Sequence, residues 1–317
     1  MSLPLPKRTG IWLALLLEVV LLAILTSSIG NEHNFESTFL NWSNLTQVIR
    51  AVSFIAIMAV GQAMVVIAGG IDLSVGSALG LSAVVTAVVL SQNFPILPSI
   101  LAGIVVGALN GLLNGLLITR AKLPPFIASL GMMSIARGLA FALTGGETIR
   151  GLPEAFLTIG QGTVLLIPTP IVIMAMIAVL AGLILAKTPW GRSVYAIGGN
   201  EEAANYSGID VRRVKMWVYT VCGLSAGVAG VLFASRFGVG QSTAGLGYEL
   251  DVIAAVVIGG ISLSGGRGTI LGAIIGSLLM GILRNGLVLL NVSAYWQQVA
   301  IGLVILLAVV MDRKTKR

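Results

Sequence analysis

The sequence predicts an all-α integral membrane protein with about ten transmembrane helices. Of its 317 residues, 56% are hydrophobic and only 10% are charged, and its mean hydropathy is +1.00. Soluble domains carry charge on about a quarter of their residues, so this composition excludes an ordinary water-soluble core. Forty glycines suit closely packed membrane helices better than β structure. We therefore expect a single transmembrane domain over 1–317, with glycine-broken helices and one long cytoplasmic loop at 187–215.

The positions of the basic residues support this number of spans. Ten apolar runs are expected to cross the membrane, at 11–29, 46–68, 72–91, 96–118, 124–144, 164–186, 216–235, 250–263, 270–290 and 295–311. Lysine and arginine concentrate in the cytoplasmic loops of membrane proteins. If the chain starts inside, ten spans place nearly every basic cluster on that side, namely Lys7 and Arg8, Arg120 and Lys122, the loop 187–215, Arg267 and the tail 313–317. Both termini are therefore expected in the cytoplasm.

The first apolar run is expected to remain as an uncleaved helix. It follows Lys7 and Arg8 as a secretory signal would, but it continues to Ile29 without a small-residue cleavage site. Glu18 lies in the middle of this run, where a charged residue costs on the order of 2–3.5 kcal/mol on insertion scales. We expect an interhelical hydrogen bond or ion pair there, and the candidate partners are Arg137 and Arg284.

A glycine-rich segment follows the second run and has a copy near the end of the chain. Residues 69–76 (GGIDLSVG) and 259–266 (GGISLSGG) align as GGI-x-LS-x-G. Glycine pairs and hydroxyl groups that interrupt an apolar run are typical of discontinuous helices at transport sites. The likeness favours internal duplication and convergence on a glycine-rich turn equally.

The run 96–118 carries glycines at every fourth position, which are Gly103, Gly107, Gly111 and Gly115. That spacing leaves one face of a helix without side chains, so a neighbouring helix can approach closely. Asn110 and Asn114 share this face, and we favour hydrogen bonds between helices as their role.

The loop 187–215 is the most polar stretch of the chain. It contains five of the nineteen basic residues and three of the twelve acidic ones, between apolar runs long enough to cross a bilayer. Its positive balance places it in the cytoplasm. We expect Pro189–Gly191 to break the helix that arrives from the membrane, and 198–200 to provide a second break. The alternative is an ordinary solvated connector.

A short capped helix is expected inside this loop. Asn200 can cap it, and Glu201 and Glu202 then fall in the first turn, where the helix dipole favours negative charge. The helix continues through Ala203 and Ala204, and Gly208 is a natural stop. One or two turns of helix would therefore lie free at the membrane surface.

Other functions are excluded by composition and by missing motifs. The net charge of +7 is explained by basic cytoplasmic loops rather than by nucleic-acid binding. His33 and Cys222 are the only residues of their types, so we expect no metal site and no disulfide. No stretch reads GxxxxGK[ST] or HExxH, so we expect no catalytic residues and no cofactor bound by this chain. If ATP drives this protein, a different polypeptide binds it.

The loop also carries a family resemblance. Glu202-Ala203-Ala204-x-x-x-Gly208 resembles the EAA-x3-G signature of permease subunits in ATP-binding-cassette (ABC) importers, and YAIGGNEEAANYSGI at 195–209 is similar to the ribose and simple-sugar branch. The resemblance extends from about residue 44 to 312 and is densest at 59–80, 195–210 and 244–272. In that family the short helix docks in a cleft of a separate ATP-hydrolysing subunit. Glu201 and Glu202 would then contact the ATPase, and Gly208 would keep the helix short.

The resemblance implies a bacterial inner-membrane protein that imports a ribose-like pentose or hexose. A periplasmic binding protein would deliver the sugar, a second permease copy would complete the membrane part, and ATP would bind the partner subunit. A sugar path needs neutral and acidic hydrogen-bonding groups, for which the candidates are Gln62, Asp72, Ser74, Gln241 and Asp251. The same side chains could equally join helices to one another.

Three other functions remain open from the sequence. An ion-coupled secondary transporter would need acids deep in the membrane, and Asp72 and Glu18 are the strong candidates. A structural or signalling membrane protein fits the long cytoplasmic loop less well. Within the ABC importers, a permease for branched-chain amino acids or nucleosides is the nearest alternative.

Overall fold

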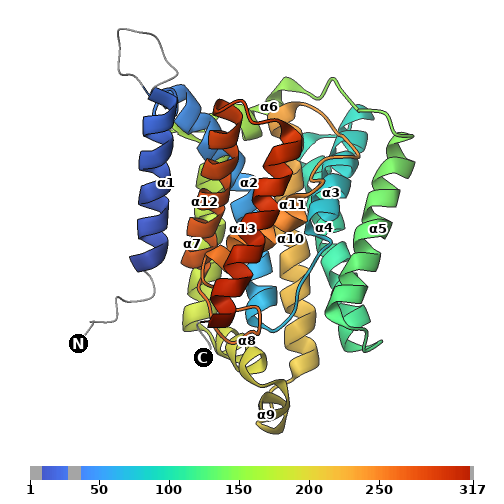
Figure 1. The fold of residues 1–317 in the computed structure, drawn as a ribbon. Helices are drawn as coiled ribbons and strands as arrows, with labels where there is room; N and C mark the ends of the chain where they lie inside the picture. Colours follow the sequence, from blue (N-terminus) through green and yellow to red (C-terminus); the bar gives the residue numbers. More distant parts are fainter. Residues whose placement is uncertain (1–8, 28–36, 315–317) are drawn as a thin grey trace, which may run out of the picture.

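The structure is a computed structural model, and it describes residues 9–27 and 37–314. Lys7, Arg8, His33 and residues 315–317 lie outside the described parts. Within them the chain is almost wholly helical, and the long helices stand side by side in one bundle (Figure 1). The helices are α1 (Thr9–Ser27), α2 (Trp42–Ile67), α3 (Val75–Ser91), α4 (Ile96–Thr119), α5 (Pro125–Thr144), α6 (Glu154–Gln161), α7 (Thr169–Lys187), α8 (Pro189–Gly199), α9 (Glu201–Tyr206), α10 (Val211–Phe237), α11 (Tyr248–Ile258), α12 (Ile270–Leu289) and α13 (Ala294–Lys314). A small antiparallel hairpin, β1 (Thr163–Val164) with β2 (Ile167–Pro168), precedes α7.

The expectation of an all-α membrane protein is confirmed. Seven helices in the described residues are long and apolar enough to cross a bilayer, namely α1, α2, α4, α5, α7, α10 and α12. Helices α3 and α13 add shorter apolar segments. The expected count of ten crossings stays a prediction.

Two expected spans differ from the structure because glycine-rich turns shorten them. The run 72–91 becomes helical only at Val75, after an irregular segment. The run 250–263 is replaced by α11, whose 11 residues end at Ile258 before a glycine pair. At 1.5 Å per residue, α11 is about 16 Å long, roughly half the thickness of a hydrocarbon core.

Close helix packing at the centre of the bundle confirms the expected glycine face. α10 packs against α4 along most of its length. A β-carbon added to Gly107 would lie 2.5 Å from Cα of Gly227 in α10, and one added to Gly115 would lie 2.9 Å from Cα of Met216. Only glycine allows the two backbones to approach this closely. α2, buried along nearly all of its length, packs beside them.

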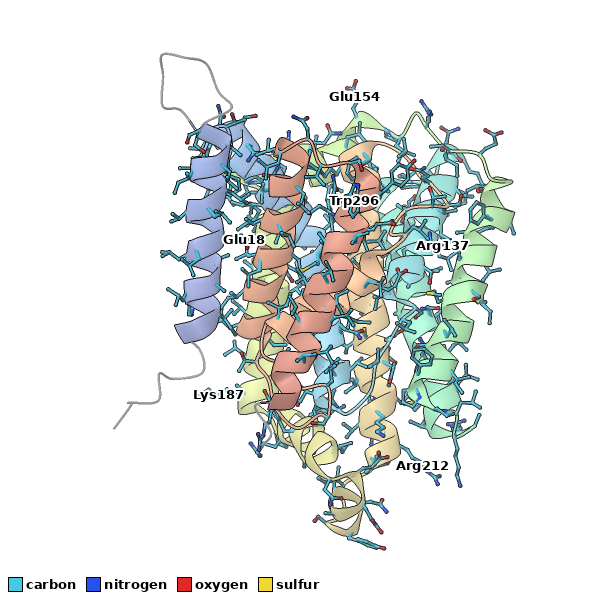
Figure 2. All side chains as sticks on the ribbon, in the orientation of Figure 1. Glu18, Arg137, Glu154, Lys187, Arg212 and Trp296 are labelled. Atoms are coloured by element: carbon cyan, nitrogen blue, oxygen red, sulfur yellow. The ribbon has the colours of Figure 1, made fainter. Side chains whose placement is uncertain are left out.

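The two ends of the bundle differ in what they carry. α8 and α9 protrude at one end, where the first turn of α1 and the last turn of α13 also lie (Figure 1). Lys187 and Arg212 are at this end, and Glu154 is at the other (Figure 2). That the end with α8 and α9 faces the cytoplasm stays a prediction.

Candidate functional site

The loop 187–215 is more helical than its sequence suggested. α7 ends at Lys187, as the nearby proline predicts. The residues expected to remain broken, Pro189–Gly191, instead open α8, because proline is well tolerated in the first turn of a helix. The hydroxyl of Thr188 caps this helix by accepting a hydrogen bond from the N–H of Gly191 at 3.1 Å. α8 therefore links the membrane helix α7 to α9.

The predicted conformation of the short helix α9 is confirmed. Asn200 is extended, with φ −160° and ψ 104°, and its Oδ1 accepts a hydrogen bond from the N–H of Ala203 at 3.0 Å. Glu201 and Glu202 occupy the first turn. Gly208, with φ +85°, turns the chain away after the last turn. The helix has six residues and projects beyond the bundle (Figure 1).

Side chains of α9 divide between an inner and an outer face. Ala204 is buried against the bundle, whereas Glu202, Ala203 and Tyr206 are exposed. Tyr206 has 81% of its surface accessible. α9 therefore presents an exposed aromatic ring and an exposed carboxylate, and both are available to a partner protein.

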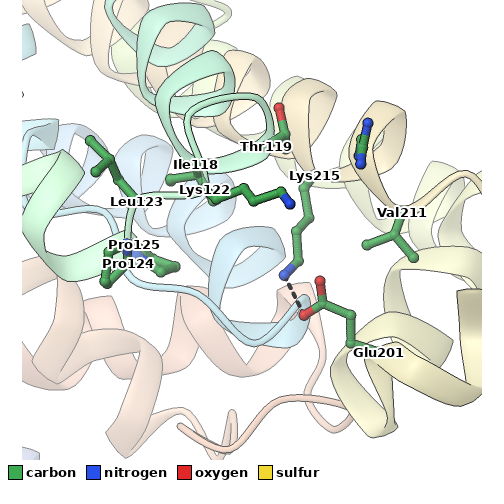
Figure 3. A pocket seen from close by; sticks show the side chains of 10 residues that line it. Ile118, Thr119, Lys122, Leu123, Pro124, Pro125, Glu201, Val211 and Lys215 are labelled. Carbon is green, nitrogen blue, oxygen red and sulfur yellow. Dashed lines mark hydrogen bonds and ion pairs between the residues drawn. The ribbon is translucent and has the colours of Figure 1, made fainter.

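A pocket of about 410 Å³ lies beside α9 (Figure 3). It is formed by the loop between α4 and α5, by α9 and by the start of α10, and Lys122, Arg212 and Lys215 contribute basic side chains to it. Nζ of Lys215 pairs with Oε2 of Glu201 at 2.5 Å. Glu201 is thus tied to α10 within the chain, and Glu202 is the acidic residue of α9 that is more available to a partner.

A buried polar cluster holds the glycine-rich segment between α2 and α3, residues 68–74, which we call the first break. Oδ1 of Asp72 accepts hydrogen bonds from the N–H of Ser74 at 2.8 Å and from its hydroxyl at 2.7 Å. Nδ2 of Asn114 donates to Asp72 at 3.2 Å, and Nδ2 of Asn110 donates to the Ser74 hydroxyl at 2.8 Å. With its amide oriented to satisfy both groups, Gln62 pairs with the backbone N–H and C=O of Asp72 at 3.2 Å.

Three of the predicted path residues therefore meet at one place. Gln62, Asp72 and Ser74 are each at most 1% exposed, so in this conformation they brace the break and face no open channel. Their neighbours Asn110 and Asn114 join α4 to the break by hydrogen bonds, as expected. Because an unpaired buried donor or acceptor costs about 1–3 kcal/mol, this network favours one conformation of residues 68–74.

The first break and the segment between α11 and α12, residues 259–269, which we call the second break, share one turn geometry. Gly69 and Gly260 have φ of +82° and +80°, and each follows the C-terminus of a helix. The N–H groups of Gly69 and Gly70 bond the carbonyls of residues 66 and 65, and those of Gly260 and Ile261 bond residues 257 and 256. These are Schellman-type caps. The structural match pairs Gly69 with Gly260, one residue away from the sequence alignment.

A second polar cluster lies between α2, α10, α11 and α12. Asp251 forms an ion pair with Arg284 at 3.1 Å, and the Arg284 guanidinium lies 5.8 Å from the centre of the Tyr248 ring. Nη2 of Arg236 donates to Oε1 of Gln47 at 2.7 Å. Asp251 is a predicted path residue and Arg284 was expected as a partner of Glu18, whereas Tyr248, Arg236 and Gln47 were missed.

Aromatic rings and a further arginine, Arg50, complete this second polar cluster, which we call the outer cluster. The rings of Phe54, Phe233 and Phe237 contact one another, with centroids 4.5–6.5 Å apart, and Arg236 lies 5.6 Å from the Phe237 ring. Nε of Arg50 is buried without a hydrogen-bond partner in the described residues. Arginines inside or next to apolar runs were the signal that could have identified the cluster, because such residues face a polar interior.

The remaining predictions concern Gln241 and Glu18. Gln241 is exposed, on the loop between α10 and α11. Nη1 of Arg137 fixes that loop by donating to the carbonyls of Ser242 and Ala244 at 2.6 and 2.7 Å. The expectation that Glu18 pairs with Arg137 or Arg284 is wrong, because the first binds the loop and the second binds Asp251.

Comparison with known proteins agrees with the resemblance of the loop 187–215 to permease subunits of ABC importers. The family model described as branched-chain amino acid transport system / permease component matches residues 44–309. The ribose import permease protein RbsC of Bacillus subtilis (strain 168) is 47% identical over 311 residues, which cover 97% of this chain and 93% of that protein. RbsC of Escherichia coli (strain K12) is 41% identical over 314 residues, 96% of each chain. The L-arabinose transport system permease protein AraH of E. coli K12 is 38% identical, covering 89% of this chain and 87% of that protein. No solved structure matches the chain.

Proposed function

Because the chain belongs to the branched-chain amino acid transport system permease family and is a sugar-importer permease of the ABC class, we propose that the sugar it moves is ribose. It is a multi-pass protein of the bacterial inner membrane, and its function as a transport subunit involves an ATPase and a binding protein. The observation that carries the choice of ribose is 47% identity to a ribose permease along 97% of the chain. Relatives that are named for allose and arabinose are 36% and 38% identical.

The ATPase acts on this chain through α9. Support comes from the shape of this short helix, which is capped by Asn200 and followed by the turn at Gly208. Its side chains Glu202 and Tyr206 are exposed. The ion pair of Glu201 with Lys215 joins α9 to α10, and α8 connects α9 to α7 along the chain. A displacement of α9 therefore moves two membrane helices, while the partner subunit binds the ATP.

The sugar meets the outer cluster on its way through the membrane. Arg236, Gln47 and the ion pair of Asp251 with Arg284 offer donors and acceptors for hydroxyl groups. Tyr248 and Phe237 offer flat apolar faces beside them. Gln241 lies on the exposed loop that leads to the cluster. Gln62, Asp72 and Ser74 act on the path indirectly, by holding the first break.

Two copies of this chain form the membrane part, with both termini in the cytoplasm. The support is the family pattern, together with the first turn of α1 and the last turn of α13, which lie at the same end of the bundle as α8 and α9 (Figure 1).

Reconstitution in liposomes tests the proposed function. The permease, its ATPase and its binding protein are assembled with ATP on the cytoplasmic side, and uptake of radiolabelled ribose is measured with excess leucine or a protonophore present. We expect uptake that requires ATP and is unaffected by either addition. Competition by leucine would favour an amino acid permease, and collapse with the protonophore at constant ATP would favour an ion-coupled transporter.

A further inference from the structure

The two glycine breaks meet at the end of the bundle that carries α8. The last residue of α2, Ile67, accepts a hydrogen bond through its carbonyl from the N–H of Gly266 at 2.9 Å. Gly266 belongs to the segment between α11 and α12, so the second break is bonded to the helix that leads into the first. The sequences of the breaks are alike, but nothing in that likeness places them together.

α8 packs its backbone against both breaks at Gly198. A β-carbon on Gly198 would overlap the Ile67 carbonyl oxygen and lie 2.5 Å from the N–H nitrogen of Gly266. A β-carbon on Gly265 would lie 2.9 Å from Cα of Gly198, and one on Gly69 would lie 3.9 Å from the same atom. The contact is therefore between three backbones, with no side chain to absorb a displacement.

A hydrogen bond joins α8 to the second break about one turn before Gly198. The Tyr195 hydroxyl donates to the carbonyl of Gly268 at 2.8 Å. Burial raises the pKa of the Tyr195 phenol above its ordinary value, so the group stays a neutral donor. Val194 and Ile197, on the same helix, are almost completely buried in the bundle. α8 is thus attached firmly to the membrane part, although it is only 11 residues long.

We propose that α8 carries the movement of α9 to both glycine breaks at once, with Gly198 as the positioning residue at the three-backbone contact. A single residue, Asn200, separates α8 from α9. The breaks lack continuous helical hydrogen bonding, so their backbone can be displaced without breaking a helix, and in the first break the displacement rearranges the hydrogen bonds of Asp72. The first break carries Asp72, and the second is joined directly to α11, which carries Asp251. The inference rests on the proposed function, because it supposes that an ATPase moves α9.

Two adjacent glycines provide a matched test. Gly198→Ala places a methyl group inside the contact, whereas Gly199→Ala places one where nothing lies within 4 Å. Both positions are in the same helix, so the gain in helix propensity is the same. In the reconstituted complex we expect Gly198→Ala to hydrolyse ATP but to move at least tenfold less ribose per ATP, and Gly199→Ala to match the wild type. Equal ratios in the two variants would overturn the proposal.

A reporter that does not depend on the sugar separates this proposal from the choice of ribose. The only cysteine, Cys222, is buried, so a fluorophore attached at Ser264→Cys reports on the exposed part of the second break. We expect its signal to change on ATP addition in the wild type and in Gly199→Ala, and to be abolished in Gly198→Ala. If Gly198→Ala does not assemble, Tyr195→Phe takes its place, and we expect it to reduce the signal change at least twofold. A full signal change in the variant tested contradicts the proposal, whichever sugar is transported.

Discussion

At the scale of single residues, glycine and buried polar groups set the conformation of the site. Gly69, Gly208 and Gly260 occupy the left-handed region, where a β-carbon costs roughly 1–2 kcal/mol. Asp72 and its partners hold the first break through hydrogen bonds rather than through a counter-charge. A substitution at these positions therefore changes backbone geometry, and its effect reaches beyond the residue itself.

Gly208→Val should uncouple transport from ATP hydrolysis. A β-branched side chain at φ +85° is strained, although nothing lies within 4 Å of the added β-carbon. The end of α9 then shifts, while the protein remains in the membrane. We expect ribose uptake to fall at least tenfold at an unchanged membrane level of the protein. Gly208→Asn is the control, because asparagine tolerates this conformation, and normal uptake by the valine variant would argue strongly against a coupling role.

Asp72→Ala should destabilise the fold. It leaves the N–H of Ser74 and the amide of Asn114 without their shared acceptor, at about 1–3 kcal/mol for each buried donor. We expect the Tm of the purified protein in detergent to fall by several degrees. Ser91→Ala, which removes only an exposed hydroxyl bonded within its own helix, should leave the Tm unchanged. An equal Tm for the two variants would mean that the cluster does not hold the break.

At the scale of elements, the sequence predicted what depends on local chemistry. The cap at Asn200, the acidic first turn of α9 and the stop at Gly208 follow from intrinsic preferences of these residues, and the structure reproduces them. The glycine face of 96–118 was predictable for the same reason, since its spacing alone removes side chains from one side.

Features that depend on tertiary packing could not be predicted. α8 was missed because Pro189 and Gly191 are also breakers, and burial of Val194 and Ile197 in the core, which stabilises the helix, depends on tertiary packing. Hydropathy did not distinguish the short α11 from a full span, because the apolar residues continue past its glycine cap. The outer cluster was missed since its members come from four helices that are distant in sequence.

Arg236→Gln should weaken sugar transport without affecting the ATPase. The change removes a charged donor in the outer cluster, and a hydrogen bond to a charged group contributes about 1.5–3 kcal/mol. We expect at least a tenfold loss of ribose uptake at saturating binding protein, with basal ATP hydrolysis unchanged. Arg150→Gln, an exposed position outside the cluster, serves as the control. Equal uptake by the two variants would remove Arg236 from the path.

At the scale of the whole molecule, the fold connects two distant regions through a short route. α9 is at one end of the bundle (Figure 1), next to the start of α10, and Arg236 of the outer cluster is in the last turn of that 27-residue helix. Between them are α8, the two breaks and α11, which are shorter and less regular than the flanking helices. A scaffold of long helices around a deformable centre suits a gate that another subunit operates.

The most direct test of this account is a crosslink from α9 to the ATPase. A photoactivatable crosslinker is attached at Tyr206→Cys, whose native side chain is 81% exposed on α9, in the assembled importer. Glu154→Cys, at the opposite end of the bundle, is the control (Figure 2). The account predicts a permease–ATPase product from position 206 and none from position 154. Reaction of position 206 with lipid or water only, in a complex that still hydrolyses ATP and imports ribose, would contradict it.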